Sequence, residues 1–130
     1  MKRFGVRFDR NAVSLFDRSD GTKIRFAVGR YEKAGKPELC DVKITDKCPI
    51  GCRFCYMDST IFGKHGSVKN IETIAREMGR AKVWEVALGG GETTSHPEFV
   101  KILKIFQDNG VVPNFTTKVP AEPVKPEKSR

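Results

Sequence analysis

Three cysteines, Cys48, Cys52 and Cys55, form a C-x3-C-x2-C pattern near the middle of the chain. Cysteine thiolates are the protein ligands of iron–sulfur clusters, and a [4Fe–4S] cluster held by only three of them keeps one iron without a protein ligand. A small molecule can coordinate that iron. The competing interpretation is a zinc site with Cys40 as the fourth ligand, but C-x7-C-x3-C-x2-C lacks the paired ligands of structural zinc sites. The spacing therefore favours an iron–sulfur cluster.

The segments around the cysteines alternate between strand and helix patterns. Residues 39–44, 83–88 and 111–116 read as strands, and apolar residues at helical spacing predict helices that include 71–78 and 99–106. The order strand–helix–strand–helix–strand predicts a parallel sheet with right-handed crossovers. We therefore expect an α/β fold with about three parallel βα units.

The ends of these three strands carry the unusual residues of the chain. The first strand ends in the cysteine loop, the second in Gly89, Gly90, Gly91 and Glu92, and the third close to Thr116. Functional residues of parallel βα folds collect at the carboxyl ends of the strands. We therefore expect the cysteines and the glycine turn to meet on one rim of the sheet.

The remaining segments divide the chain into three parts. Residues 3–28 alternate apolar and polar side chains between polar turns, which predicts an antiparallel β-meander; with the loop that follows, it forms a first unit over 1–38. The βα core is expected over 39–118. Residues 119–130 hold three prolines among charged residues, and we expect a disordered tail there.

Composition and charge limit the class of protein. No apolar run approaches the ~20 residues of a membrane span, and four cysteines without an export signal predict a reducing, cytoplasmic location. The net charge is +8, yet residues 40–100 carry eight basic and eight acidic side chains. The excess positive charge lies outside the cysteine segment, so solvated surfaces are favoured over nucleic-acid binding.

From about residue 39 to 117, the chain resembles the N-terminal part of a radical S-adenosylmethionine (radical SAM) enzyme. The likeness rests on the cysteine spacing, on the aromatic residues Phe54 and Tyr56 beside the third cysteine, and on the Gly-Gly-Glu pattern after the next strand. It implies that Cys48, Cys52 and Cys55 bind a [4Fe–4S] cluster whose fourth iron is chelated by S-adenosylmethionine.

The resemblance also implies roles for the residues around the cluster. Gly90, Gly91 and Glu92 would approach the methionine amino group, and Phe54 would lie near the adenine. Reductive cleavage of the cofactor would yield a 5′-deoxyadenosyl radical that takes hydrogen from an unknown substrate. The electron would come from a donor such as flavodoxin or ferredoxin. No residue beyond the cluster ligands is assigned a catalytic role.

Two departures from the family pattern qualify these roles. Thr93 follows Glu92 where many relatives have proline. The family's TIM-type barrel normally continues through about six βα units, whereas this chain enters its Pro-rich tail after three strands. The resemblance therefore implies a truncated, partial TIM-type barrel preceded by the β-meander. A second chain that completes the barrel is one solution. The alternative is a non-catalytic iron–sulfur fragment or interaction module.

Other residues have simpler interpretations. Cys40 is expected to pack as a small buried residue, and His65 to be a solvated loop histidine. His96 is interpreted as a residue at the start of a helix, and Glu92 has the alternative role of capping the glycine turn. Thr116 and Thr117 are weak candidates for cofactor or substrate contact.

Overall fold

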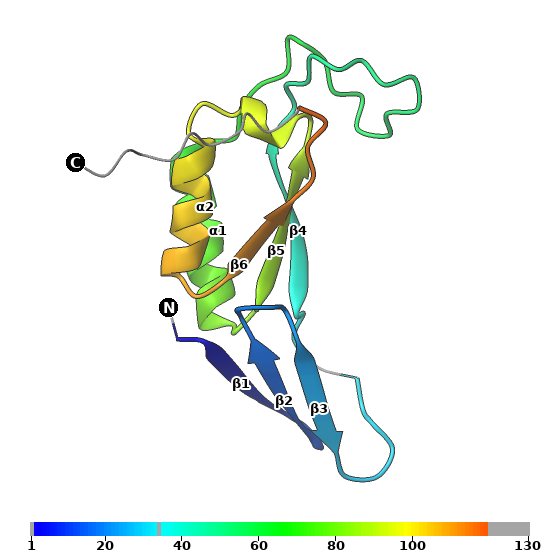
Figure 1. Cartoon of the computed structure of the whole chain (residues 1–130), viewed down its shortest axis with the longest axis vertical. Helices are drawn as coiled ribbons and strands as arrows, with labels where there is room; N and C mark the ends of the chain where they lie inside the picture. The colour runs from blue at the N-terminus through cyan, green and yellow to red at the C-terminus, as the bar shows by residue number, and fades with distance from the viewer. Residues whose placement is uncertain (1, 34, 120–130) are drawn as a thin grey trace, which may run out of the picture.

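The computed structural model describes residues 2–33 and 35–119. The strands and helices are β1 (Phe4–Asp9), β2 (Ala12–Asp17), β3 (Lys23–Ala27), β4 (Leu39–Thr45), α1 (Val68–Arg80), β5 (Glu85–Gly90), the 3-10 turn η1 (Thr93–Ser95), α2 (Phe99–Asp108) and β6 (Val112–Phe115). They form an antiparallel sheet, β1-β2-β3, and a parallel sheet, β4-β5-β6 (Figure 1). This confirms a mixed α/β fold. The expected disorder of the tail concerns residues 120–130, which lie outside the described residues.

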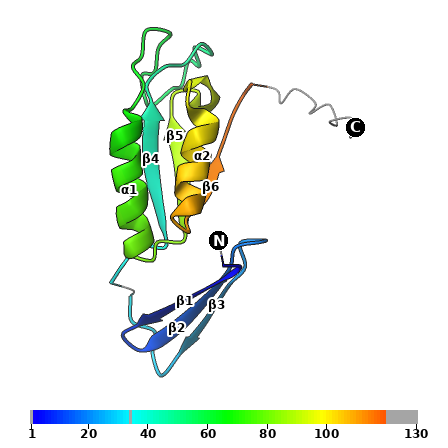
Figure 2. The ribbon, with the colours of Figure 1, turned by 90° about the vertical axis from the view of Figure 1, so that its left-hand side faces the viewer.

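The parallel sheet carries both helices on one face (Figure 2). Ile44, Val86 and Leu88 point toward the helices and pack against apolar residues of α1 and α2, among them Ala75 and Ile102. Every second residue of the strands and every third or fourth residue of the helices therefore contributes to this core. The other face of β4 and β5, represented by Asp41 and Lys43, is open in the described part of the chain.

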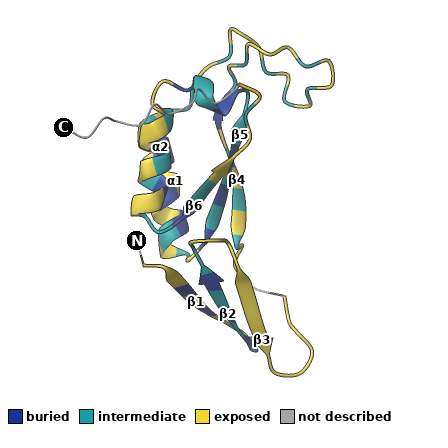
Figure 3. Ribbon diagram, viewed as in Figure 1, coloured by how far each residue is buried: buried dark blue, intermediate teal, exposed yellow. Residues whose placement is uncertain are grey.

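The antiparallel sheet buries the face that carries Gly5 and Arg7 of β1, while Phe4, Val6 and Phe8 on the other face are exposed (Figure 3). Phe16 of β2, which pairs with Gly5, also lies on the buried face. The sequence pattern located the strands but not the face that packs. This face is buried because it contacts the parallel sheet and the residues just before its strands.

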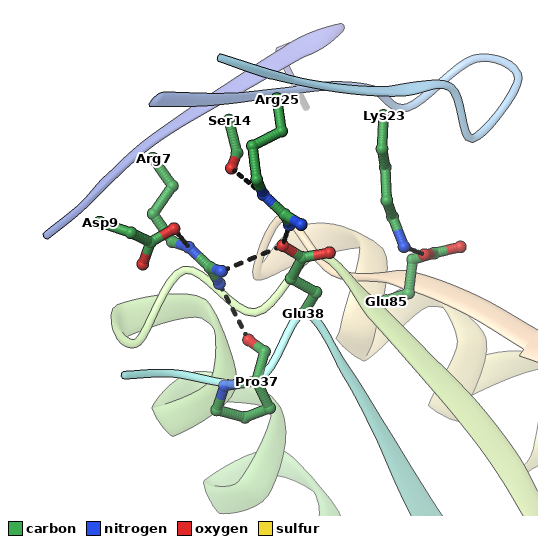
Figure 4. Close-up of polar contacts among 8 residues, drawn as sticks. All are labelled: Arg7, Asp9, Ser14, Lys23, Arg25, Pro37, Glu38 and Glu85. Carbon is green, nitrogen blue, oxygen red and sulfur yellow. Dashed lines mark hydrogen bonds and ion pairs between the residues drawn. The ribbon is translucent and has the colours of Figure 1, made fainter. Parts of the chain in front are cut away.

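Aromatic stacking and ion pairs join the two sheets. The Phe16 ring stacks on Trp84 with centroids 5.2 Å apart, and the Arg7 guanidinium lies 4.9 Å from the Trp84 ring. Arg7 also donates to the Pro37 carbonyl (3.0 Å) and to Glu38 (3.2 Å), as Figure 4 shows. Trp84, with an exposed fraction of 1%, is therefore a core residue.

Further ion pairs and one arginine anchor reinforce this junction. Arg25 pairs with Glu38 and Lys23 with Glu85 (Figure 4). Arg18 donates to the carbonyl of Gly110, two residues before β6. The meander thus covers the amino-terminal ends of the parallel strands, opposite to the cysteine loop. In the described part of the chain, no helix has the length and apolar character required to cross a membrane.

Candidate functional site

A cavity of about 720 Å³ lies at the carboxyl ends of β4, β5 and β6. Its volume is in the range of small-molecule and cofactor sites. Most of the residues singled out from the sequence line it: Cys48, Cys52, Cys55, Gly90, Gly91, Glu92, Thr116 and Thr117. The expectation that the three strand ends meet at one rim therefore agrees with the structure.

Main-chain hydrogen bonds close the base of the cysteine loop. The N–H of Asp46 donates to Lys64 (2.8 Å), and the N–H of Gly66 donates to the carbonyl of Ile44 (2.8 Å). Further along, the N–H of Cys48 donates to the carbonyl of Thr60 (2.8 Å). The loop is therefore tied to the end of β4, and the cysteines project from a fixed base.

The three loop cysteines are free and half-buried. Among the described residues, no three histidine, cysteine or acidic side chains converge closely enough to hold a metal ion. Cys40 packs instead against the helix-covered core, as expected, and this weakens the zinc alternative. The three thiols thus share one cavity without forming a closed metal site.

Two of the thiols have donor groups beside them. Backbone N–H groups of Ser59, Met57 and Asp58 point at the Cys55 sulfur and lower the pKa of its thiol. Because the thiolate is the form that binds metals, this environment suits a cluster-binding loop. The Nζ atom of Lys118 lies 3.1 Å from the Cys52 sulfur, within hydrogen-bond distance.

Backbone hydrogen bonds join the glycine turn to the cysteine loop. The N–H of Gly91 donates to the carbonyl of Thr45 (2.7 Å), and the N–H of Glu92 donates to that of Lys47 (2.9 Å). A Cβ at Gly90 or Gly91 would lie closer than 3.0 Å to one of these carbonyl oxygens. Gly90 also has a φ of +120°. Glycine is needed here because the two backbones approach each other so closely.

Glu92 is a buried carboxylate with an exposed fraction of 5%. It accepts hydrogen bonds from the hydroxyls of Thr94 (2.8 Å) and Thr117 (2.6 Å), and from the N–H of Lys118 (3.1 Å). Burial raises the pKa of Glu92, but these hydrogen bonds together outweigh it and hold the pKa below its usual value. Glu92 therefore stays ionised and links the end of β5 to the segment after β6.

The capping role considered for Glu92 is also present. Its Oε1 atom accepts the backbone N–H of Thr94 at 3.3 Å, at the start of η1. This bond shares the carboxylate with the contacts from Thr117 and Lys118. The side chain therefore orders the glycine turn and faces the cavity at once.

Phe54 differs from the other candidates. Its side chain is 82% exposed and it is not among the residues that line the cavity, whereas Tyr56 is. The Nζ atom of Lys118 lies 5.2 Å from the centre of the Phe54 ring. Lys118 was not singled out from the sequence. The sequence signal that could have indicated Lys118 is its position after the third strand, next to Thr117.

His65 and His96 are in contact near the end of the cysteine loop. Their rings meet edge to face at 5.0 Å. His65 is half-buried rather than solvated, with Nδ1 2.9 Å from the hydroxyl oxygen of Thr45, and burial is the main cause that lowers its pKa. His96 accepts the N–H of Glu98 before α2, in agreement with a role at the helix start, and donates to the carbonyl of Gly66.

A family model described as the radical SAM superfamily matches residues 42–126, more than half of the chain. The protein therefore belongs to the radical SAM superfamily, which confirms the resemblance inferred from the motifs. The match includes the cysteine loop, the glycine turn and both helices.

The chain is also similar to individual proteins. PqqA peptide cyclase of Bradyrhizobium diazoefficiens is 27% identical over 88 residues, which are 66% of this chain and 23% of that protein. The crystal structure of Streptococcus suis SuiB bound to S-adenosylmethionine matches with a TM-score of 0.70 at 12% identity, over 93% of this chain and 42% of SuiB. A second SuiB crystal structure matches with a TM-score of 0.68 and covers 41% of that chain. The chain thus spans less than half of the length of each of these proteins.

Proposed function

We propose that the chain binds a [4Fe–4S] cluster through Cys48, Cys52 and Cys55, and binds S-adenosylmethionine at the adjoining glycine turn. The observation that supports this most is that the cysteine loop and the Gly-Gly-Glu turn line one cavity and are hydrogen-bonded through their backbones. When bound, the two groups supply a 5′-deoxyadenosyl radical by reductive cleavage of the cofactor.

The residues of the chain would bind and orient these groups. The backbone donors around Cys55 stabilise its thiolate. The ammonium group of Lys118 lies within hydrogen-bond distance of the Cys52 sulfur. The ionised carboxylate of Glu92 faces the same cavity and provides a negative charge for the ammonium group of the cofactor. Phe54 would have to turn toward the cavity to meet the adenine.

The substrate stays unknown, and two partners are proposed. An electron donor such as flavodoxin or ferredoxin would reduce the cluster. A second chain would complete the barrel beside β6, because β6 is an edge strand of the sheet, and Asp41 and Lys43, on the face opposite the helices, are exposed in the described residues. We propose a cytoplasmic location on the basis of the reduced cysteines.

The second candidate function is a non-catalytic iron–sulfur fragment or interaction module. It is favoured by the open face of the parallel sheet, because Asp41 and Lys43, on the cavity side of β4, are exposed to solvent. An enzyme of this class must exclude water from its reactive site. Sustained formation of 5′-deoxyadenosine by the isolated, reduced chain would rule this candidate out.

Anaerobic reconstitution with iron and sulfide tests cluster binding. We expect about four irons per chain and, after reduction, an electron paramagnetic resonance signal that changes when S-adenosylmethionine is added. Cys52→Ala should lose the signal, whereas the matched control Cys40→Ala should keep it, because Cys40 packs in the core away from the loop. A wild-type chain without a cluster, or equal loss in both variants, would contradict the proposal.

A further inference from the structure

One face of the antiparallel sheet is apolar and uncovered in the described part of the chain. We call it the outer meander face, and it consists of Phe4, Val6, Phe8, Val13, Leu15, Ile24, Phe26 and Val28. The most exposed aromatic side chains are Phe8 and Phe26, at 76% and 62%. Exposure of phenylalanine side chains to water is unfavourable in free energy, and a large exposed apolar patch indicates an interaction site.

The strand register makes this face continuous. Leu15 on the central strand lies between Val6 and Ile24, and Val13 lies between Phe8 and Phe26. Side chains directly opposite each other on neighbouring strands are in contact. Two apolar rows therefore cross all three strands, with no charged side chain between them.

The opposite face of the meander cannot take this partner because it already packs on the parallel sheet. Arg7, Ser14 and Arg25 lie on that side, where the arginines bind Glu38 and Pro37 (Figure 4). Since side chains alternate across a strand, the outer meander face points away from the rest of the described chain.

The area of this face matches one half of a stable protein interface. With roughly 200 Å² for a phenylalanine and somewhat less for each aliphatic residue, the exposed fractions leave about 700 Å² of surface. Two such faces would bury about 1,400 Å², within the range of specific complexes. We propose that the outer meander face binds the same face of a second copy of this chain, as two sheets packed face to face.

The charges at the border of the face permit this contact despite the net charge of +8. Arg3, before β1, pairs with Asp17 at 2.6 Å, and Arg10, after β1, pairs with Glu32 at 3.3 Å. Because these cations are neutralised within one copy, two outer meander faces can approach without strong repulsion. Symmetric interfaces with apolar centres are typical of homodimers.

Sedimentation equilibrium of the full chain tests the proposal. Protein interfaces of about 1,600 Å² have dissociation constants from micromolar to picomolar, and we expect the wild type to be a dimer at tens of micromolar. Phe8→Lys should weaken dimerisation at least 100-fold, because each copy would bury an unpaired charge. The matched control is Val100→Lys on α2, since Val100 is also 76% exposed but lies far from the face in sequence and fold. It should leave the dimer intact.

Circular dichroism and Trp84 fluorescence should be unchanged in both variants, because each side chain projects into solvent within one copy. A monomeric wild type over this concentration range would overturn the proposal. A dimer that withstands both Phe8→Lys and Phe26→Lys would also overturn it, because another surface, such as the edge of β3 or β6, would then mediate self-association.

Discussion

Replacing Gly90 with alanine should break the junction between the glycine turn and the cysteine loop. The φ of Gly90 is +120°, where an L-residue costs roughly 1–3 kcal/mol. The new Cβ would also lie closer than 3.0 Å to the carbonyl oxygen of Thr45, which accepts the N–H of Gly91. Moving that carbonyl endangers this hydrogen bond and the one from Glu92, each worth about 1 kcal/mol. We therefore expect a loss of about 3–5 kcal/mol.

Chemical denaturation followed by fluorescence measures this loss, because Trp84 is the only tryptophan and is buried against Phe16. The matched control is Gly89→Ala, since a Cβ at Gly89 has no atom within 4 Å and Gly89 has no positive φ. Its stability should be unchanged or higher by about 0.5 kcal/mol. Equal stability of Gly90→Ala and Gly89→Ala would refute the reasoning.

Three further predictions concern the residues beside the cavity. Glu92→Gln should lower the free energy of unfolding by about 2 kcal/mol, because the new NH2 group, a donor, would face the N–H of Lys118, which is also a donor. Unfolding in urea measures this loss, and an unchanged midpoint would contradict the prediction. Since the folded pKa of Glu92 is lowered, its contribution is present above the unfolded value of 4.5 and is lost as pH falls through the folded value, so Glu92→Gln should flatten the acid limb of a stability–pH curve. In the reconstituted protein, Lys118→Met should lower the reduction potential of the cluster by roughly 40 mV, the equivalent of one hydrogen bond of ~1 kcal/mol to the Cys52 sulfur. Lys118→Arg serves as the control in the same redox titration. Equal potentials for the wild type and Lys118→Met would argue against this contact.

The parallel unit was predictable because its signals are local. Apolar periodicity located β4, β5, β6 and both helices to within a few residues, and the rule that parallel strands end on one rim brought the cysteine loop and the glycine turn together. The reason why Gly90 and Gly91 must be glycine was not predictable in this form. It depends on carbonyl groups more than 40 residues earlier in the chain.

The sequence pattern did not predict which face of the meander is buried. Alternation of Phe4, Val6 and Phe8 with smaller or charged residues indicates a strand with two different faces, and the apolar face is normally the buried one. Here Arg7 is buried because Trp84 and Glu38, distant in sequence, provide a ring and a carboxylate for its guanidinium. Such long-range partners leave no trace in a local pattern.

The site residues were predictable to different degrees. Motif spacing singled out the three cysteines and Glu92, which line the cavity. Lys118 and the half-buried state of His65 were missed, because neither belongs to a motif and each depends on a neighbour from a different segment, Cys52 for Lys118 and Thr45 of β4 for His65. The roles of Phe54 and of the glycine turn in cofactor binding stay predictions.

Two hydrogen bonds between backbone atoms, from Gly91 to Thr45 and from Glu92 to Lys47, link the two rim loops, and the hydroxyl of Ser95 adds a side-chain contact to the Lys47 carbonyl. The geometry of the two backbone bonds does not depend on which side chains occupy most positions around them. We therefore expect substitutions of other residues that line the cavity to change its shape and polarity, while the spacing between cysteine loop and glycine turn stays the same.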